Sequence, residues 1–312
     1  MKKITLGVLL AAGVLLSLSR AGYSGQGVDP QAIRMMAVGD NIGLLFMFTG
    51  SGPHTLAFGS EDETIIVIDP KGPGTGATII GKVHSGAEGR VTKLINTNAH
   101  RAASNGEYPD AIEIIAHENT KAAMAKMAAF KGPNAKFLPN KTFTDKMTFA
   151  VKSVGEKEGR SRIDLYYFGA GSTNGDTVVV FPSLDTVYMG DLFPGRSAPV
   201  IDTANGGSAV ALPDTLDKAM VALKAEPGLK LVMPGRQLPP PGPYVPRWLG
   251  LRDLQEYADF NRAFLNAVKE AMKAGKSVAE ATAELKLPEK FKDYGMEQAA
   301  ANVKAIYDEL KK

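Results

Sequence analysis

The sequence predicts an α/β protein in which two packed β-sheets are covered by helices on their outer faces. Two successive halves of the chain are rich in short apolar and β-branched runs, with helix-like stretches between the runs. Residues after about 248 have instead the periodicity of long amphipathic helices. The 33 glycines and 19 prolines among 312 residues indicate many tight turns, more than a helical bundle needs.

Residues 1–21 are typical of a secretory signal peptide. Lys2 and Lys3 form a positive start, residues 4–18 form an apolar run, and small residues flank the expected cleavage site after Ala21. We therefore expect a periplasmic or secreted protein. An uncleaved membrane anchor is the alternative, although the run is shorter than the roughly 20 apolar residues that span a bilayer.

The charges of the expected mature chain balance. The full sequence has 36 Lys and Arg against 33 Asp and Glu, and three of the basic residues, Lys2, Lys3 and Arg20, lie in the signal peptide, which leaves 33 against 33. This balance predicts no attraction to nucleic acid or to an anionic membrane surface, so we expect neither as a partner. Because the chain has no cysteine, neither a disulfide nor a lipid-modified cysteine can form.

The first half of the chain predicts five strands and two helices. The strands are expected at 42–49, 55–58, 64–68, 91–96 and 113–116, and the helices at 75–84 and 119–130. Residues 50–53 (GSGP) predict a hairpin turn between the first two strands. The β-branched run TIIVI at 64–68 is typical of a strand that is buried on both faces.

The second half predicts further strands followed by helices. Strands are expected at 163–168, 177–181, 187–189 and 229–233, and an apolar stripe from Leu216 to Leu223 predicts a helix that ends at Pro227-Gly228. Beyond the prolines at 239–243, apolar stripes at 254–272 and 296–310 indicate helices that face the core.

Three stretches that lie beside predicted strands carry the functional signal. They are INTNAHRAASNG at 95–106, GAGSTNGD at 169–176 with VYMGDLF at 187–193, and LVMPGR at 231–236. In order and context they resemble the metal-binding signatures of the metallo-β-lactamase superfamily, and residues 64–69 resemble its early strand that ends in a structural aspartate. The resemblance covers about residues 36–236. It implies a four-layer αββα sandwich over residues 22–240, with a helical extension over residues 241–312 packed on it.

Active members of this superfamily hold two metal ions through a Thr-His-x-His-x-Asp-His loop, the histidine of Gly-His-Thr-x-Gly-Asp, the aspartate of Gly-Asp-Leu and the histidine of Pro-Gly-His. The metal lowers the pKa of a bound water and so supplies a hydroxide nucleophile. By this resemblance the chain retains the ligands His100 and Asp191. The five substituted positions are Asn98, Ala102, Ala103, Ser172 and Arg236. The retained framework residues are Asp69, Thr97, Gly106, Thr173, Gly175, Asp176 and Gly190.

The substitutions predict that the dinuclear metal site is lost. Alanine donates nothing to a metal, Asn98 and Ser172 are poor zinc ligands, and Arg236 places a permanent cation where a metal ion would lie. We expect no cofactor, and the alternative is one weakly bound zinc ion on His100 and Asp191, completed by water or Ser172. We also expect Arg236 to approach Asp191 within ion-pair distance.

The remaining residues predict no other known catalytic scheme. The chain has no cysteine nucleophile, no Gly-x-Ser-x-Gly elbow and no phosphate-binding Gly-x-x-x-x-Gly-Lys loop. A Ser172 nucleophile with His100 as its base is a further alternative. The other histidines, His54, His84 and His117, match no motif position and are expected at the surface or at helix caps.

Two functions follow from this contrast between a retained framework and lost ligands. In the first, the protein is a non-catalytic binding module, or pseudoenzyme, whose former active-site cleft holds a small-molecule ligand. In the second, it is a divergent hydrolase of an ester, lactone or amide that uses one metal ion or none. The missing ligands favour the first.

Overall fold

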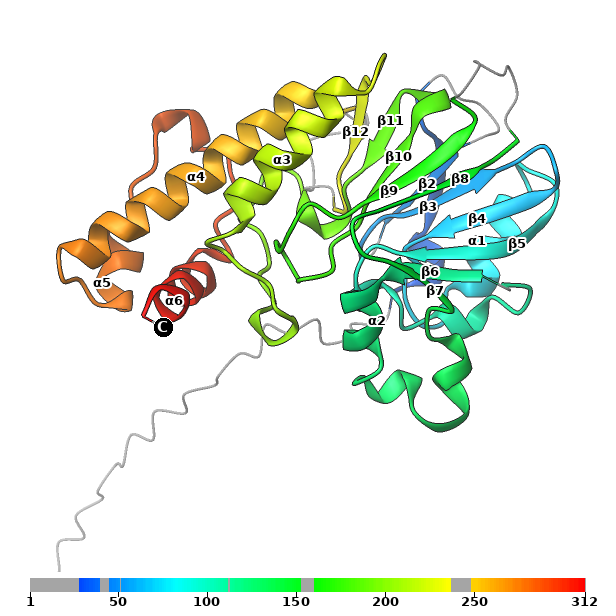
Figure 1. The fold of residues 1–312 in the computed structure, drawn as a ribbon, viewed down its shortest axis with the longest axis horizontal. Helices are drawn as coiled ribbons and strands as arrows, with labels where there is room; N and C mark the ends of the chain where they lie inside the picture. Colours follow the sequence, from blue (N-terminus) through cyan, green and yellow to red (C-terminus); the bar gives the residue numbers. More distant parts are fainter. Residues whose placement is uncertain are drawn as a thin grey trace, which may run out of the picture.

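Two β-sheets packed face to face form the centre of the protein, and helices cover both outer faces (Figure 1). The computed structural model describes residues 28–39, 45–50, 52–111, 113–152, 160–236 and 248–311. The predicted signal peptide and the prolines at 239–243 lie outside these residues. The four layers, helix, sheet, sheet and helix, are those that the sequence predicts.

The first sheet has seven strands in sequence order. They are β1 (Arg34–Ala37), β2 (Leu45–Thr49), β3 (Thr55–Gly59), β4 (Thr64–Ile68), β5 (Arg90–Asn96), β6 (Glu113–His117) and β7 (Lys141–Phe143). Neighbouring strands run antiparallel from β1 to β4 and parallel from β4 to β7. The turn between β2 and β3 is the predicted hairpin, although Ser51 lies outside the described residues.

The second sheet has five strands in the order β12-β11-β10-β9-β8. They are β8 (Lys146–Ala150), β9 (Arg162–Tyr166), β10 (Val178–Phe181), β11 (Thr186–Tyr188) and β12 (Leu231–Met233). The pairing of β11 with β12 is parallel, and the other pairings are antiparallel. Helix α3 (Leu212–Ala225) lies between β11 and β12 in the chain and ends before Pro227-Gly228, as its sequence predicts.

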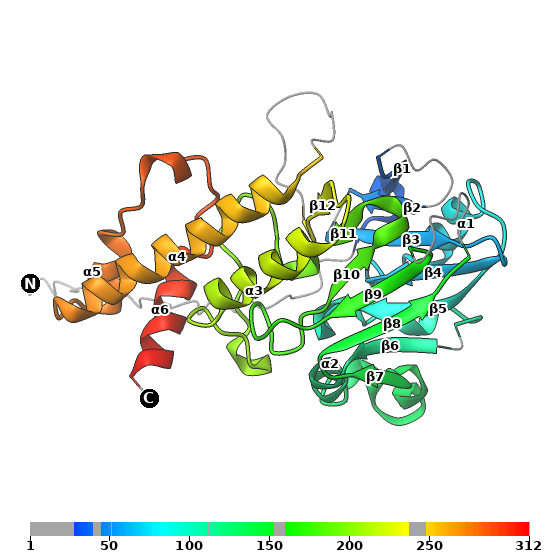
Figure 2. The same cartoon turned by 45° about the horizontal axis from the view of Figure 1, so that its top comes forward.

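Apolar side chains fill the space between the sheets and beneath the helices. Phe58 of β3 stacks on Phe181 of β10 with ring centroids 5.8 Å apart, in a cluster that both sheets supply. A second cluster lies under α1 (Gly76–Val83) on the outer face of the first sheet, and a third joins the second sheet to α3 and α4 (Leu251–Lys273). Figure 2 shows α1 and α3 on opposite sides of the two sheets.

The C-terminal helices extend the layer that α3 begins. Helix α4 packs along α3, and α5 (Val278–Ala283) and α6 (Ala299–Leu310) lie at its far end (Figure 1). Their buried residues belong to the same apolar cluster as the second sheet, so the extension packs on the sandwich. Within the described ranges, no helix is long and apolar enough to cross a membrane.

The structure differs from the predicted elements mainly at the sheet edges. The strands β1, β7 and β8 were not predicted from the sequence, and each forms the edge of a sheet. Edge strands are short and carry solvent-facing polar residues, as in β8, where exposed and partly buried residues alternate, so they lack a continuous apolar run.

The helix expected at 119–130 is shorter than predicted. Helix α2 ends at Met124, and a separate 3₁₀ turn, η4, covers Ala128–Phe130. Six further residues of α-helix would rotate the side chain of Phe130 well away from that of Met124. The break instead lets both side chains pack in one apolar cluster.

Candidate functional site

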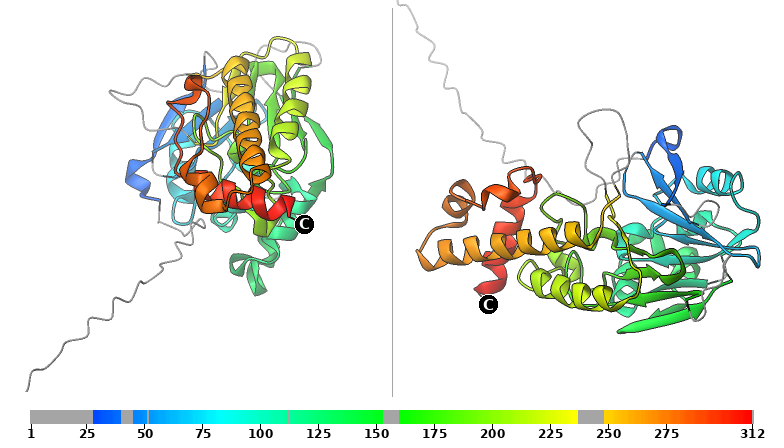
Figure 3. Two further views of the ribbon diagram at one scale, coloured as in Figure 1. Left: turned by 90° about the vertical axis from the view of Figure 1, so that its left-hand side faces the viewer. Right: turned by 90° about the horizontal axis from the view of Figure 1, so that it is seen from above.

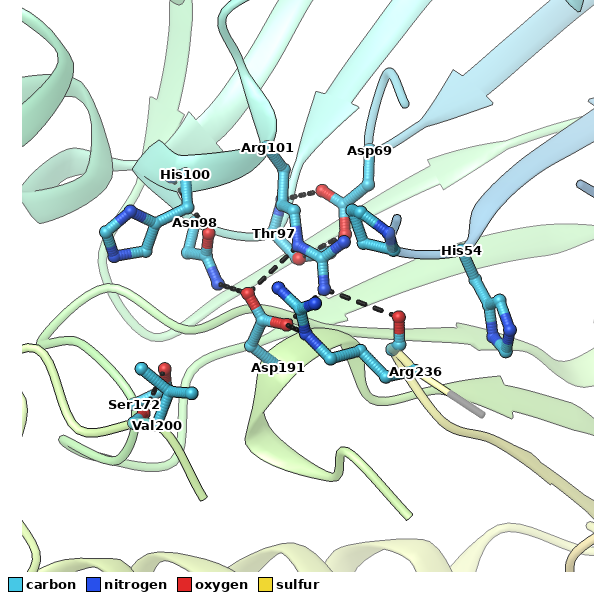
Figure 4. A network of polar contacts seen from close by, with 12 residues as sticks. His54, Asp69, Thr97, Asn98, His100, Arg101, Ser172, Asp191, Val200 and Arg236 are labelled. Carbon is cyan, nitrogen blue, oxygen red and sulfur yellow. Dashed lines mark hydrogen bonds and ion pairs between the residues drawn. The ribbon is translucent and has the colours of Figure 1, made fainter. Parts of the chain in front are cut away.

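The predicted site residues lie where parallel strands of both sheets end. Asp69 follows β4 and Asn98 follows β5 in the first sheet, whereas Asp191 follows β11 and Arg236 follows β12 in the second. Because the carboxyl ends of parallel strands share an edge, the topology brings these four side chains into one region (Figure 4).

Asp69 is the centre of the retained framework. It is fully buried, and its carboxylate accepts hydrogen bonds from the backbone N–H of Thr97 at 2.7 Å, from Thr97 Oγ1 at 2.5 Å and from the Tyr188 hydroxyl at 3.0 Å. Burial raises the pKa of Asp69 to about 6, while Arg101 and the Thr97 hydrogen bonds oppose that rise. Asp69 therefore ties β4, β5 and β11 together beneath the site.

Two glycines of the framework allow close backbone approach. Gly190 has a φ of +53°, and a Cβ atom there would lie 2.6 Å from Thr97 Oγ1. A Cβ atom on Gly175 would lie 2.4 Å from Thr120 Oγ1. Larger residues would displace the loops that carry Asp191 and Asp176.

The other framework residues stabilise the two flanking loops. Asp176 is buried and accepts hydrogen bonds from the backbone N–H of Thr173 at 2.8 Å and from its hydroxyl at 2.9 Å. Burial raises the pKa of Asp176 to about 7. Gly106 lies against Phe137, where a Cβ atom would approach the ring to 2.9 Å.

The loop after β5 forms a short 3₁₀ turn, η2 (Ala99–Arg101), with Asn98 as its N-cap. Asn98 has an extended backbone, with φ −158° and ψ 176°, and precedes the turn, whereas Arg101 is its last residue. Both donate hydrogen bonds to Asp191 Oδ2, from Asn98 Nδ2 at 3.0 Å and from Arg101 Nε at 2.9 Å.

The remaining residues of this loop have different surroundings. Ala99 and Ala102 pack in an apolar cluster with Met124 and Phe130. Ala102 is fully buried, so the position where the motif resemblance implies a carboxylate ligand is part of a small core in this protein. The loop also carries His100, together with the exposed Ala103.

Asp191 is enclosed by cations. Besides Nε, Arg101 donates through Nη2 to Asp191 Oδ1, which makes the pair bidentate, and both side chains are almost fully buried, with 1% and 3% exposed. Burial by itself would raise the pKa of Asp191, but Arg101, Arg236 and Asn98 hold it well below its ordinary value. The carboxylate is therefore ionised, and both of its oxygens accept hydrogen bonds.

Arg236 approaches Asp191 as predicted, although it is the weaker of the two cationic partners. Its Nε lies 3.6 Å from Asp191 Oδ1, and 35% of its side chain is exposed. Arg101 is not among the predicted site residues, because its position in the superfamily motif is not a ligand position. The only signal in the sequence is that Arg101 is a basic residue within the motif stretch 95–106, and its contact with Asp191 depends on the fold.

His100 and Ser172 do not form a nucleophile and base. His100 Nε2 lies 2.8 Å from Asp202 Oδ2, and this contact lowers the pKa of Asp202 to about 2. The Ser172 hydroxyl donates to the backbone carbonyl of Val200 at 2.8 Å rather than to His100 (Figure 4). Asp202 was not predicted, and it comes from a loop that no motif covers.

The expectation for His54 was wrong, because this residue is buried beside the site. Its backbone N–H donates to Gly235 O at 2.9 Å and its Nδ1 lies 2.9 Å from Pro234 O, so it joins the turn before β3 to the loop that carries Arg236. Burial, with a smaller contribution from nearby cations, lowers the pKa of His54 to about 4. The ring is neutral near pH 7.

The other two histidines are capping residues, as predicted. His84 is the exposed C-cap of α1. His117 is the N-cap of α2, where its Nδ1 accepts from the backbone N–H of Asn119 at 3.2 Å. Neither is placed with the motif residues.

Comparison with solved structures identifies the architecture. The crystal structure of DIM-1 metallo-β-lactamase matches 76% of this chain and 99% of its own length, with a TM-score of 0.56 and 16% identity. The metallo-β-lactamase from Pontibacter korlensis matches 74% of this chain and 99% of its own, with a TM-score of 0.53 and 17% identity. The chain has the metallo-β-lactamase fold.

A longer metallo-β-lactamase-fold match extends further along the chain. The sec-alkylsulfatase Pisa1 from Pseudomonas sp. matches 89% of this chain and 50% of its own length, with a TM-score of 0.67 and 11% identity. No family model matches the chain, and no curated protein matches it. At these identities the likeness establishes the fold, and the chemistry has to be inferred from the site.

The residues at this position of the metallo-β-lactamase fold do not fit a metal pair. Within the described ranges, no group of three or more His, Cys, Asp or Glu side chains is placed to hold a metal ion. Of the two retained ligands, Asp191 is bound by the guanidinium of Arg101, and His100 is paired with Asp202. A cation of the protein itself therefore lies where the fold would place metal ions.

Proposed function

We propose that this protein is a non-catalytic binding module built on the metallo-β-lactamase fold. The observation that carries this proposal is the buried bidentate pair between Arg101 and Asp191. Active members rely on metal ions to generate hydroxide. A guanidinium cannot do so, because it is always protonated and has no vacant coordination position.

The retained framework supports a binding role rather than simple loss of the site. The hydrogen bonds of Asp69 join the ends of β4 and β5, and those of Asp176 stabilise the loop before β10. The partly exposed side chains of His100, Asp202 and Arg236 then form a polar rim where a small molecule can make hydrogen bonds. We propose this rim as the ligand site.

Metal content tests the proposal directly. We expect the protein, purified without chelators from zinc-supplemented medium, to contain far less than one zinc ion per chain by elemental mass spectrometry. We expect hydrolysis of a panel of β-lactams, lactones and esters to stay at the background rate. Stoichiometric zinc that survives dialysis would contradict the proposal.

A divergent hydrolase remains the second candidate, because the His100–Asp202 pair resembles a general base with its orienting carboxylate. We predict that His100→Ala changes neither zinc content nor the hydrolysis rate. The matched control is His84→Ala, which removes an exposed histidine elsewhere. A hundredfold loss of a measurable activity in His100→Ala alone would favour the hydrolase.

We also propose that the protein is exported, on the basis of the signal-like residues 1–21. Expression of the full chain in a Gram-negative host should yield a periplasmic product whose mass corresponds to cleavage after Ala21. A product that retains the first 21 residues in the membrane fraction would instead indicate an anchor.

A further inference from the structure

Residues 119–144 carry a concentrated positive charge. This stretch contains five lysines at a regular spacing of five residues and no aspartate, glutamate or arginine. The lysines are Lys121, Lys126, Lys131, Lys136 and Lys141, and all five are exposed. Since the expected mature chain is balanced, the rest of it carries a matching excess of acidic residues.

These lysines lie on one projection of the fold, which we call the lysine lobe and define as residues 121–141. The lobe comprises most of α2 (Glu118–Met124), the 3₁₀ turns η4 and η5 (Gly132–Phe137) and the start of β7. It projects from the β7 edge of the seven-stranded sheet in two perpendicular views (Figures 1 and 3). Phe130 and Met124 anchor its base in the apolar cluster beside η2.

Little of this charge is neutralised within the protein. Lys141 Nζ lies 3.2 Å from Glu113 Oε1, whereas Lys131 Nζ donates to the backbone carbonyl of Ala125. Lys136 lies over the ring of Phe137. In the part of the chain that the structure describes, no acidic group lies within ion-pair distance of Lys121, Lys126, Lys131 or Lys136.

We propose that the lysine lobe is a docking surface for the headgroups of an anionic phospholipid membrane. Clusters of four to eight basic residues adsorb to anionic lipid through additive electrostatic attraction. The balanced net charge of the expected mature chain predicted no affinity for an anionic membrane. A net charge does not report, however, whether the basic residues are clustered on one part of the surface. The function proposed for the rim is independent of this surface.

The composition of the lobe favours a lipid surface over a nucleic acid. Arginine is the residue suited to bidentate phosphate recognition, and the lobe has none. Binding of single strands also needs exposed aromatic rings for stacking, and Phe130 is buried while Phe137 packs against the base of the lobe. The large exposed apolar side chains of the described chain, Val221 and Leu310, lie outside the lobe, so adsorption should be electrostatic and reversible.

Vesicle co-sedimentation tests this proposal. The purified protein should bind vesicles of phosphatidylcholine with phosphatidylglycerol at low salt, should not bind pure phosphatidylcholine, and should be released at high salt. The triple variant Lys126→Gln, Lys131→Gln and Lys136→Gln should lower the partition coefficient about 100-fold at low ionic strength. A triple variant with Lys218→Gln, Lys224→Gln and Lys292→Gln removes the same charge from exposed positions elsewhere and should partition like the parent.

Several results would overturn the proposal. Equal binding to both lipid compositions, or an equal loss in the two triple variants, would show that the lobe is not the docking surface. Binding to heparin or duplex DNA at the same salt without vesicle binding would assign the lobe to a polyanion instead. Circular dichroism and thermal midpoints of both variants should match the parent, because exposed lysine substitutions change stability by only about 0.5 kcal/mol.

Discussion

Arg101 and Asp191 form the contact that distinguishes this site from a metal centre. Two residues 90 positions apart in sequence make a buried bidentate pair, and Asn98 donates to the same carboxylate. Removal of one partner of a buried ion pair costs far more than the pair contributes, because the remaining charge loses its solvation. Replacement of the two arginines around Asp191 should therefore lower the free energy of unfolding by very different amounts.

We predict that Arg101→Ala lowers the free energy of unfolding by about 3 to 5 kcal/mol, because it leaves Asp191 buried without its bidentate partner. Arg236→Ala should lower it by less than about 1 kcal/mol, since its side chain is 35% exposed and its nearest atom lies 3.6 Å from the carboxylate. Urea denaturation measures both values.

A double variant provides the control for this prediction. Arg101→Ala with Asp191→Ala should be more stable than Arg101→Ala alone, because the second change removes the unpaired charge. If Arg101→Ala and Arg236→Ala lose the same stability, or if the double variant is less stable than Arg101→Ala, Arg101 is not the main partner of Asp191.

Helix α6 holds the loop that supplies the partners of His100 and Ser172. Its Glu309 accepts hydrogen bonds from the Ser208 hydroxyl and from the backbone N–H of Ala209, and its Asn302 donates to Pro199 O at 2.9 Å. Residues 197–209 between these contacts include Val200 and Asp202. The C-terminal extension therefore shapes the rim of the candidate site, although no motif lies within it.

We predict that Glu309→Ala lowers the free energy of unfolding by about 1 to 2 kcal/mol and speeds amide hydrogen exchange in residues 198–209, because two hydrogen bonds to a charged group are lost. The neighbouring Asp308→Ala is the matched control, since Asp308 pairs with the exposed Lys304 of the same helix. Exchange that is equally fast in both variants would show that Glu309 does not hold the loop.

At the scale of the whole molecule, Lys71 links the pH of the solution to the stability of the fold. It is buried and donates to Phe48 O at 3.2 Å and to Pro53 O at 2.7 Å, so it joins the ends of the β2–β3 hairpin to the chain after β4. Burial lowers the pKa of Lys71 to about 7, and Arg101 and Arg236 contribute to the shift.

We predict that the free energy of unfolding rises with pH between about 7 and 9.5. In this window the unfolded chain holds the Lys71 proton while the folded protein releases it, so each increase in pH favours the folded state. The free energy of unfolding of Lys71→Met, measured by urea denaturation, should change less with pH across this window than that of the parent. Parallel pH profiles for the two proteins would show that Lys71 is protonated in both states.

The sequence by itself determined the central strands, the order of the motifs and the absence of most of the ligand residues that the resemblance implies. Strands such as β4 and β10 are continuous apolar runs, so their burial follows from local composition. The missing ligands could be identified equally well, because an alanine or an arginine cannot coordinate zinc in any conformation.

Only the tertiary structure decided which groups bind Asp191. The partner of Asp191 lies 90 residues away in sequence, and Arg101 rather than Arg236 is the one buried against it. The burial of His54 and Lys71 and the three edge strands likewise depend on neighbours from distant segments, which local periodicity does not report. The run of lysines at 119–144 can be read in the sequence, whereas only the structure shows that these residues form one projection at the β7 edge of the sheet and that the lysines remain exposed.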